Sequence, residues 1–245
     1  MFPNPPRRVG LIGHGRIGHA VAQAIVSGRA GGWDLAAVLT RGAAAAGAHG
    51  HHTDPSTFFR VPVDLYLECA GPQALAALGE DALQRADVWS VSGSALADVA
   101  LHRRLEAMGA RTGHRLRLVA GAAGGLDAVA ALAGDPDMRL EIAIVAPERC
   151  ASFVSTVRAA ATRLPLGVNL AVAAALVGPG LDRTTVELTA DPDRSHHAIT
   201  VRASGALGSF ESRLQPVTDA QRDLHVVAAS LVAALRQADQ VVWVG

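Results

Sequence analysis

The chain of 245 residues contains no lysine, so all 22 of its basic side chains are arginine. Without an ε-amino group, no lysine Schiff base can form and no lysine can act as an acid or base. Any chemistry must therefore use other side chains or a bound cofactor. Cysteine is almost as scarce, and Cys69 and Cys150 stand far apart, in no spacing typical of a metal site. We expect both thiols to be reduced and buried rather than functional.

Excess charge and long apolar runs are also missing. The 22 arginines are balanced by 22 acidic residues, and this zero net charge gives no reason to expect a nucleic-acid partner. No apolar run reaches the roughly 18 residues of a membrane-spanning helix. Residues 1–6 also lack the basic and apolar regions of a signal peptide. The sequence predicts a cytoplasmic protein that binds neither membrane nor nucleic acid.

Half of the residues are hydrophobic, so the chain can bury a substantial core as one large or two small domains. In residues 1–120, apolar runs alternate with stretches of helical periodicity, which predicts a doubly wound parallel sheet of the Rossmann type. In residues 121–216, helices expected at 149–163 and 169–176 and short period-two runs joined by turns predict a smaller α+β domain with a mixed or antiparallel sheet. This second domain is expected to provide the substrate and catalytic site and the oligomer contacts. We expect residues 217–245, with a helix at 219–238 and a strand at 241–244, to return to the first domain.

A glycine-rich turn near the start of the chain is the strongest local signal. The apolar run Val9–Ile12 leads into Gly-His-Gly-Arg-Ile-Gly at 13–18, and a helical repeat follows. In such a turn Gly13 permits the tight bend, Gly15 lets the backbone approach a pyrophosphate, and Gly18 lets helix and strand pack closely. The free N–H groups at the start of the helix then face the phosphates. The sequence therefore predicts a site for NAD or NADP that includes Gly13, Gly15, Arg16, Ile17 and Gly18.

The residues after the second predicted strand, 34–39, bear on which dinucleotide binds. An NAD-preferring site usually has an acidic residue here that holds the ribose 2′-hydroxyl, but this chain has Thr40 and Arg41. A guanidinium group matches a 2′-phosphate, which makes NADP at least as compatible as NAD. The alternative is that Arg41 is simply solvated on a loop.

Three histidines follow, at His49, His51 and His52, just before Asp54. Imidazole nitrogens and a carboxylate can ligate a metal ion. Because no second set of ligands stands near them in the sequence, we interpret residues 43–54 as a loop near the adenosine and predict no metal site.

Two later strand ends complete the predicted cofactor site. The third strand, 63–69, ends in Glu-Cys-Ala-Gly-Pro, and the fourth, 88–92, leads into Gly93. Ligands of open α/β sheets lie outside strand ends of this kind. We therefore include Cys69, Ala70 and Ser92 among the cofactor-binding residues.

Together these motifs resemble the L-aspartate dehydrogenase family over nearly the full length of the chain. The resemblance also includes Ser94–Asp98, Gly121–Asp127, Val168–Ala171, and Ala190-Asp191-Pro192 with the histidines after it. It implies a Rossmann domain followed by a smaller α/β domain. It further implies NAD(P)-dependent oxidation of L-aspartate to iminosuccinate, which is hydrolysed to oxaloacetate and ammonia or passes to NAD biosynthesis, or the reverse amination. Carried over to this chain, Ala122 and Asn169 would contact the nicotinamide end of the cofactor.

The resemblance also implies a histidine that acts as acid and base, and this falls at His197 or His196. The family pattern of a polar residue, any residue and then histidine favours His197. Strand alternation agrees, since His197 would share a face with Ile199 and Val201. A lone histidine in a strand is otherwise commonly structural. An imidazole suits the chemistry because its pKa lies near neutral pH.

Other functions stay open at this stage. One is a related dehydrogenase or imine reductase that acts on another small amino or imino acid, and another is a non-catalytic sensor that binds NAD(P) to regulate a partner. The absent lysine weighs against homoserine dehydrogenase and dihydrodipicolinate reductase, families of similar architecture that use an active-site lysine. A sheet with one uncovered face would favour a homodimer.

Overall fold

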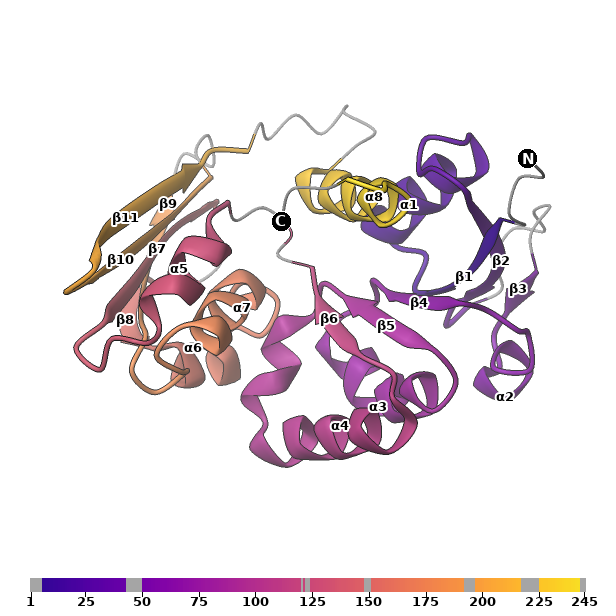
Figure 1. Cartoon of the computed structure of the whole chain (residues 1–245), viewed down its shortest axis with the longest axis horizontal. Coiled ribbons are helices and arrows are strands. Elements are labelled where there is room, and N and C mark those ends of the chain that lie inside the picture. The colour runs from indigo at the N-terminus through magenta and orange to yellow at the C-terminus, as the bar shows by residue number, and fades with distance from the viewer. Residues whose placement is uncertain are drawn as a thin grey trace. The chain divides into compact units, whose positions relative to one another are not determined.

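The computed structural model describes residues 6–42, 50–119, 121, 124–147, 151–191, 197–216 and 225–242. The chain divides into two compact units, whose elements are labelled in Figure 1. The first unit contains residues 1–121 and 223–245, and the second contains residues 122–222. Both ends of the chain thus belong to the same unit.

The first unit is built on a six-stranded parallel sheet with the strand order β3-β2-β1-β4-β5-β6. Its strands are β1 (Arg7–Ile12), β2 (Trp33–Leu39), β3 (His51–His52), β4 (Leu65–Glu68), β5 (Asp87–Ser90) and β6 (Leu116–Leu118). The chain runs outward from β1 to β3 and then crosses back to β4, so the order reverses between β1 and β4. Doubly wound sheets bind ligands outside the carboxyl ends of their strands, at this point of reversal. The predicted Rossmann-type fold is confirmed.

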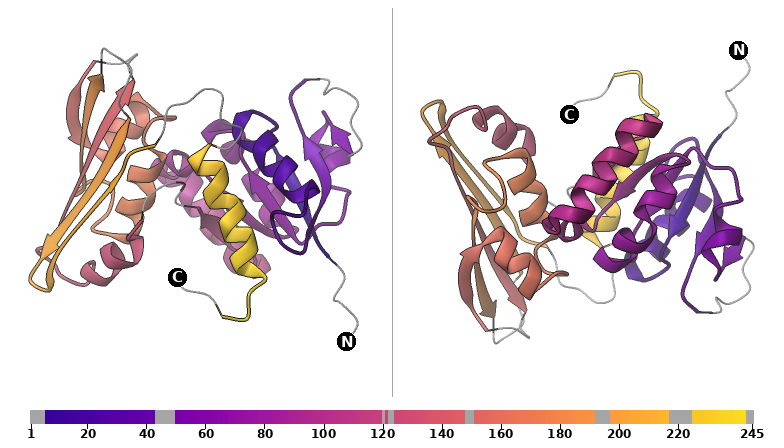
Figure 2. Two further views of the ribbon diagram at one scale, coloured as in Figure 1. Left: turned by 90° about the horizontal axis from the view of Figure 1, so that it is seen from above. Right: turned by 90° about the horizontal axis from the view of Figure 1, so that it is seen from below.

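Helices cover both faces of this sheet (Figures 1 and 2). On one face lie α1 (Arg16–Val26) and α8 (Val226–Ala238), and on the other lie α3 (Pro72–Leu83) and α4 (Val99–Thr112). The short helix α2 (Pro55–Phe58) follows β3, and a 3₁₀ helix, η1 (Gly93–Ala97), precedes α4.

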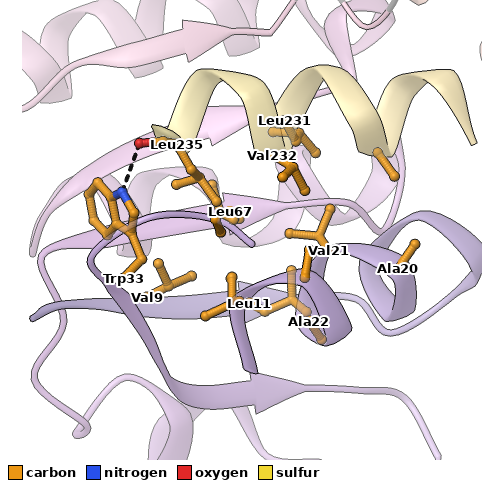
Figure 3. Packing of buried hydrophobic residues seen from close by; sticks show 14 of the residues in the cluster. Val9, Leu11, Ala20, Val21, Ala22, Trp33, Leu67, Leu231, Val232 and Leu235 are labelled. Carbon is orange, nitrogen blue, oxygen red and sulfur yellow. Dashed lines mark hydrogen bonds between the residues drawn. The ribbon is translucent and has the colours of Figure 1, made fainter. Parts of the chain in front are cut away.

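Helix α8, from the end of the chain, completes the core of the first unit (Figure 3). Its apolar side chains pack with those of α1 and β1, and the indole Nε1 of buried Trp33 donates a hydrogen bond to the carbonyl of Leu235 (3.0 Å). Beyond the helix, Asp239 accepts a hydrogen bond from the N–H of Gly32 (2.6 Å) and pairs with Arg7. These contacts hold α8 against the amino-terminal strand.

The second unit contains a five-stranded mixed sheet with the order β11-β10-β7-β9-β8. Its strands are β7 (Arg139–Pro147), β8 (Phe153–Thr156), β9 (Thr185–Asp191), β10 (Ala198–Gly205) and β11 (Gly208–Leu214). Strands β7 and β9 are parallel, and the other neighbouring pairs are antiparallel. Helices α5 (Leu126–Leu132), α6 (Val157–Arg163) and α7 (Asn169–Val177) lie on one face (Figures 1 and 2). The smaller α+β unit agrees with the prediction.

Side chains of this second sheet alternate between the helix-covered face and the opposite face, which we call the open face. On the covered face, Ile142 pairs with Val201 and both are buried. On the open face, Glu141 pairs with Arg202 and both are exposed, and Val154 is 66% exposed. No described helix of the second unit lies over the open face.

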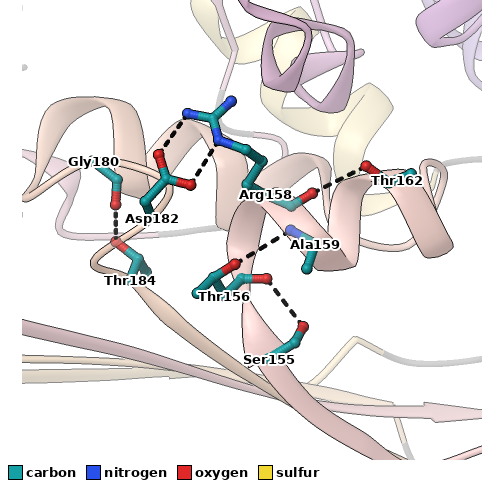
Figure 4. Close-up of polar contacts among 8 residues, drawn as sticks. All are labelled: Ser155, Thr156, Arg158, Ala159, Thr162, Gly180, Asp182 and Thr184. Atoms are coloured by element: carbon teal, nitrogen blue, oxygen red, sulfur yellow. Dashed lines mark hydrogen bonds and ion pairs between the residues drawn. The ribbon is translucent and has the colours of Figure 1, made fainter.

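The sequence predicts one helix over residues 149–163, and this is wrong for its middle part. Phe153–Thr156 forms β8, antiparallel to β9, and α6 begins only at Val157. Thr156 ends the strand and caps the helix, because its Oγ1 accepts a hydrogen bond from the N–H of Ala159 (3.3 Å; Figure 4). Aromatic and β-branched residues in this segment favour a strand, and pairing with β9 satisfies its backbone.

The end of the chain also differs from the prediction. Val241 and Val242 are exposed and form no strand, so the strand predicted at 241–244 is wrong there, and residues 243–245 lie outside the described part. The last helix begins at Val226, where the Nδ1 of His225 accepts a hydrogen bond from the N–H of Val227 (3.2 Å). Residues 217–224 of the predicted segment lie outside the described part.

Candidate functional site

The glycine turn lies at the carboxyl end of β1. Gly13 has φ +97°, and its N–H donates a hydrogen bond to the carbonyl of Leu39 (2.9 Å), which ties the turn to the end of β2. A Cβ on Gly13 would lie 2.7 Å from the Cβ of Ala70, and one on Gly18 would lie 2.0 Å from the carbonyl oxygen of Gly13. A Cβ on Gly15, by contrast, would meet nothing within 4 Å. Gly13 and Gly18 are thus required by the packing of the turn itself, whereas the space beside Gly15 is open.

Helix α1 begins at Arg16, directly after the turn. Its N-terminal residue Gly15 supplies no side-chain cap, and the first hydrogen bond within the helix runs from the N–H of His19 to the carbonyl of Gly15 (2.8 Å). The N–H groups of Arg16 and Ile17 precede that bond and have no partner within the helix. With the positive end of the helix dipole, they suit an anionic group such as a diphosphate.

Thr40 and Arg41 follow β2 at the same edge of the sheet. The N–H of Thr40 donates a hydrogen bond to the carbonyl of His52 (2.9 Å), and its hydroxyl donates to the carbonyl of Gly42 (2.6 Å). Arg41 is exposed. A permanently charged guanidinium therefore stands at the strand end where the ribose of a dinucleotide binds in this fold.

A buried carboxyl group supports the neighbouring loop. Glu68, the last residue of β4, is only 1% exposed. Its Oε1 accepts hydrogen bonds from the N–H groups of Ala70 (2.7 Å) and Gly71 (2.8 Å), and its Oε2 accepts one from the hydroxyl of Ser90 at the end of β5 (2.5 Å). The Oγ of Ser90 in turn accepts from the N–H of Ser92 (2.9 Å). Glu68 thus joins the two strand ends that carry Ala70 and Ser92.

Burial raises the pKa of both Glu68 and Cys69. It raises the pKa of Glu68, and the hydrogen bonds from Ser90, Ser92, Ala70 and Gly71 oppose that shift. Burial also raises the pKa of the Cys69 thiol, with a smaller contribution from the charge of Glu68. Cys69 therefore stays protonated and is no nucleophile. The sequence alone assigned no role to Glu68, although an ionisable residue at the end of a buried apolar strand could have indicated one.

Asn169 and His197 belong to the second unit. Asn169 is the first residue of α7, and its Nδ2 donates a long hydrogen bond to the carbonyl of Leu166 (3.5 Å). His197 is partly buried and stands directly before β10, where alternation assigns it to the same side as the buried Val201. Burial lowers the pKa of His197 below its ordinary value, so its imidazole is mainly neutral at pH 7 and able to accept a proton.

The structure brings the predicted residues of the first unit together at one edge of its sheet. Gly13 lies against Ala70, and Glu68 joins Ala70 to Ser92. Four other residues named from the sequence, Ala122, His196, His49 and Cys150, lie outside the described residues. Within the described ranges, no three histidine, cysteine or acidic side chains are grouped so as to hold a metal ion, and no helix is long and apolar enough to cross a membrane.

Comparison with known proteins identifies the family. The chain is 34% identical to L-aspartate dehydrogenase of Ruegeria pomeroyi, over 94% of this chain and 92% of that protein. It is 31% identical to L-aspartate dehydrogenase 1 of Bordetella pertussis, over 94% and 96% of the two chains. The chain belongs to the L-aspartate dehydrogenase family. The predicted family and its class, NAD(P)-dependent dehydrogenases, are confirmed.

Two family models match successive parts of the chain. Residues 13–119 match the NAD-binding domain of homoserine dehydrogenase, and residues 124–238 match the C-terminal domain of aspartate dehydrogenase. Aspartate dehydrogenase of Thermotoga maritima has a similar fold, with a TM-score of 0.80 and 23% identity over 98% of this chain and 99% of that one. An engineered D-amino acid dehydrogenase bound to NADP⁺ shares the fold at a TM-score of 0.55 and 14% identity, over 95% and 88% of the two chains. The match to a model specific to aspartate dehydrogenase thus falls on residues 124–238.

Proposed function

We propose that this enzyme oxidises L-aspartate to iminosuccinate with NAD or NADP, and that hydrolysis of the imine yields oxaloacetate and ammonia; the same site would catalyse the reverse amination. The observation that supports this most is the match over 94% of the chain to relatives named L-aspartate dehydrogenase. The glycine turn, with open space beside Gly15, supports the nucleotide half of the proposal.

Most of the cofactor contacts are assigned to the first unit. Gly13, Gly15 and Gly18, with the N–H groups of Arg16 and Ile17, would hold the diphosphate at the start of α1. Thr40 and Arg41 would hold the adenosine ribose. Cys69, Ala70 and Ser92 would add further cofactor contacts in the first unit, and Ala122 and Asn169 are the residues that the family resemblance assigns to the nicotinamide end. When bound, the nicotinamide supplies the hydride acceptor.

His197 is the proposed acid and base. Its imidazole would take a proton from the substrate amino group as the hydride leaves Cα. After releasing that proton to solvent, the neutral imidazole would activate the water that attacks the imine. Its lowered pKa, which follows from burial, keeps it ready to accept a proton at neutral pH. His196 is the alternative for this role. The two substrate carboxylates need donors, which arginines or the 92–94 segment would supply.

An assay of cofactor reduction tests the proposal. L-Aspartate should reduce NAD⁺ or NADP⁺ with release of ammonia, and His197→Ala should lower kcat by roughly 10²- to 10⁴-fold, the range of general acid–base catalysis. Turnover of another amino acid but not L-aspartate would favour a related dehydrogenase. Tight NADPH binding with no turnover of any amino acid would favour the sensor.

We also propose that two copies associate through the open face of the second sheet. Ala198 and Thr200, both buried, lie on the same face as the exposed Arg202, which donates a hydrogen bond to Glu211 (2.6 Å). A sheet face that no described helix of the second unit covers, with Val154 66% exposed, is suited to pairing with its own copy. The cytoplasmic localisation of the protein stays a prediction from the sequence.

A further inference from the structure

Three imidazoles meet at the glycine turn, and the functions assigned above do not use them. His14 stands between Gly13 and Gly15, His19 lies in the first turns of α1, and His51 opens β3. The ring centroid of His14 is 5.1 Å from that of His19 and 5.3 Å from that of His51, with interplanar angles of 65° and 73°. We call these three side chains the histidine cluster.

The topology places the histidine cluster at the end of β2. His51 pairs with Val38, next to the last residue of that strand, and His14 follows β1 at the same edge of the sheet. In doubly wound folds the residue after this strand contacts the adenosine ribose, at its 2′ position. The cluster thus lies between the diphosphate-binding turn and the ribose-binding strand end.

The imidazoles have unused capacity to bind an anion. The Nδ1 of His51 is buried and has no hydrogen-bond partner among the described residues. The pKa of His14 is lowered by burial first, and then by repulsion from the charges of His19 and His51. A phosphate carries about 1.5 to 2 negative charges at pH 7 and would remove that mutual repulsion.

The other charged groups on the surrounding elements do not offset the repulsion among the imidazoles of the histidine cluster. Arg16 on α1 and Arg41 after β2 are exposed and stay cationic at every relevant pH. On β3 the Nδ1 of His52 is engaged by the Oγ1 of Thr57 (3.1 Å), and Asp54 caps α2 through the N–H of Ser56 (2.9 Å). No described carboxylate is among the groups that shift the pKa of His14.

We propose that His14, His19 and His51 bind the 2′-phosphate of NADP and take up protons as they do so, so that the preference for NADP over NAD rises as the pH falls. This rests on the proposed dinucleotide site. The imidazolium N–H groups donate to the phosphate oxygens, which stabilise the protonated rings. NAD carries no phosphate at this position, so its binding does not stabilise the protonated rings. A preference set by Arg41 alone would not rise as the pH falls, because a guanidinium does not titrate and the phosphate itself loses negative charge towards low pH.

The test measures the Kd of NADPH and of NADH for the full chain, by calorimetry at pH 6.5, 7.5 and 8.5. Uptake of one proton changes affinity by up to about tenfold per pH unit. We expect NADPH to bind at least about fivefold more tightly at pH 6.5 than at pH 8.5, with little change for NADH. Calorimetry of NADPH in two buffers of different ionisation enthalpy should report proton uptake directly.

Variants identify the source of the pH dependence. His19→Asn combined with His51→Asn removes two of the three imidazoles, so it should reduce the pH slope of NADPH binding far more than it changes the binding of NADH. His102→Asn, on α4 of the same unit, is the matched control and should behave as the parent protein, since His102 contacts only Glu106 among the described ionisable groups (3.4 Å). Equal pH slopes for NADPH and NADH, or an unchanged slope in the double variant, would overturn the inference while the dinucleotide site stands. Binding of neither NADPH nor NADH would overturn the proposed dinucleotide site as well.

Discussion

Removal of the Glu68 carboxyl group should loosen the cofactor-binding edge of the first sheet. In Glu68→Ala the N–H groups of Ala70 and Gly71 and the hydroxyl of Ser90 all lose their acceptor inside the protein. At about 1–3 kcal/mol for each buried unsatisfied donor, we expect a loss of about 3 kcal/mol or more in the free energy of unfolding. Glu68→Gln keeps one carbonyl oxygen for the two N–H groups and should cost about half as much or less.

The same change should weaken cofactor binding, because Ala70 lies directly against Gly13 of the glycine turn. Urea unfolding and NADH titration measure the two effects. Glu80→Ala is the matched control, since the Glu80 side chain forms, among the described residues, only an exposed ion pair with Arg104 (2.8 Å), worth about 0–1 kcal/mol. Parent-like stability and NADH affinity in Glu68→Ala would refute the supporting role of this group.

The pH dependence of the Glu68 effect has a definite sign. Burial raises the pKa of Glu68 in the folded protein above its ordinary value of 4.5, so folding favours the protonated form. Its contribution to stability is therefore complete below pH 4.5 and is lost as the pH rises through the folded-state pKa. Relative to Glu68→Gln, the parent protein should lose stability over that interval. A constant difference between the two unfolding free energies would contradict the direction of the shift.

Three further outcomes follow from the geometry. Gly15→Ala should keep the parent melting temperature but bind NADH at least about tenfold more weakly. Gly13→Ala should instead lower the free energy of unfolding by about 2 kcal/mol or more, because its Cβ adds positive-φ strain and a clash. Equal behaviour of the two variants in thermal melting and NADH titration would contradict these distinct roles. Arg41→Ala should weaken NADPH far more than NADH in titrations, and an unchanged preference would remove Arg41 from the ribose site. Val154→Asp, on the open face, should shift sedimentation from dimer to monomer, and a parent profile or a monomeric parent would exclude that face.

Much of the fold is encoded locally and could be predicted from the sequence. The glycine turn needs only residues 9–18, and most strands of the first sheet are short buried apolar runs. The two-residue strand β3 is too short to show a pattern. The residues of Phe153–Thr156 favour a strand, but the segment is too short to be recognised without its pairing with β9. Local signals therefore predicted the type of most elements but not these pairings.

The parts of the site that could not be predicted depend on contacts between distant residues. Glu68 acquires its role from Ser90 on the neighbouring strand, and the sequence gives no sign that their side chains meet. The contact of His14 with His51 likewise depends on β3 lying beside β2. The role of His197 came from the family resemblance, since a single histidine before a strand carries no chemical assignment by itself.

The most direct test of the account is the pH profile of kcat/KM for L-aspartate in the parent enzyme and in His197→Ala. The parent should form NAD(P)H and ammonia from L-aspartate in equal amounts. Since the pKa of His197 is lowered and its neutral form is the base, activity should fall only as the pH drops below the ordinary histidine range. His197→Ala should lose about 10²-fold or more in kcat at unchanged NADH affinity, together with that acid limb. Parent-like turnover in His197→Ala, or no reduction of either cofactor by L-aspartate, would contradict it.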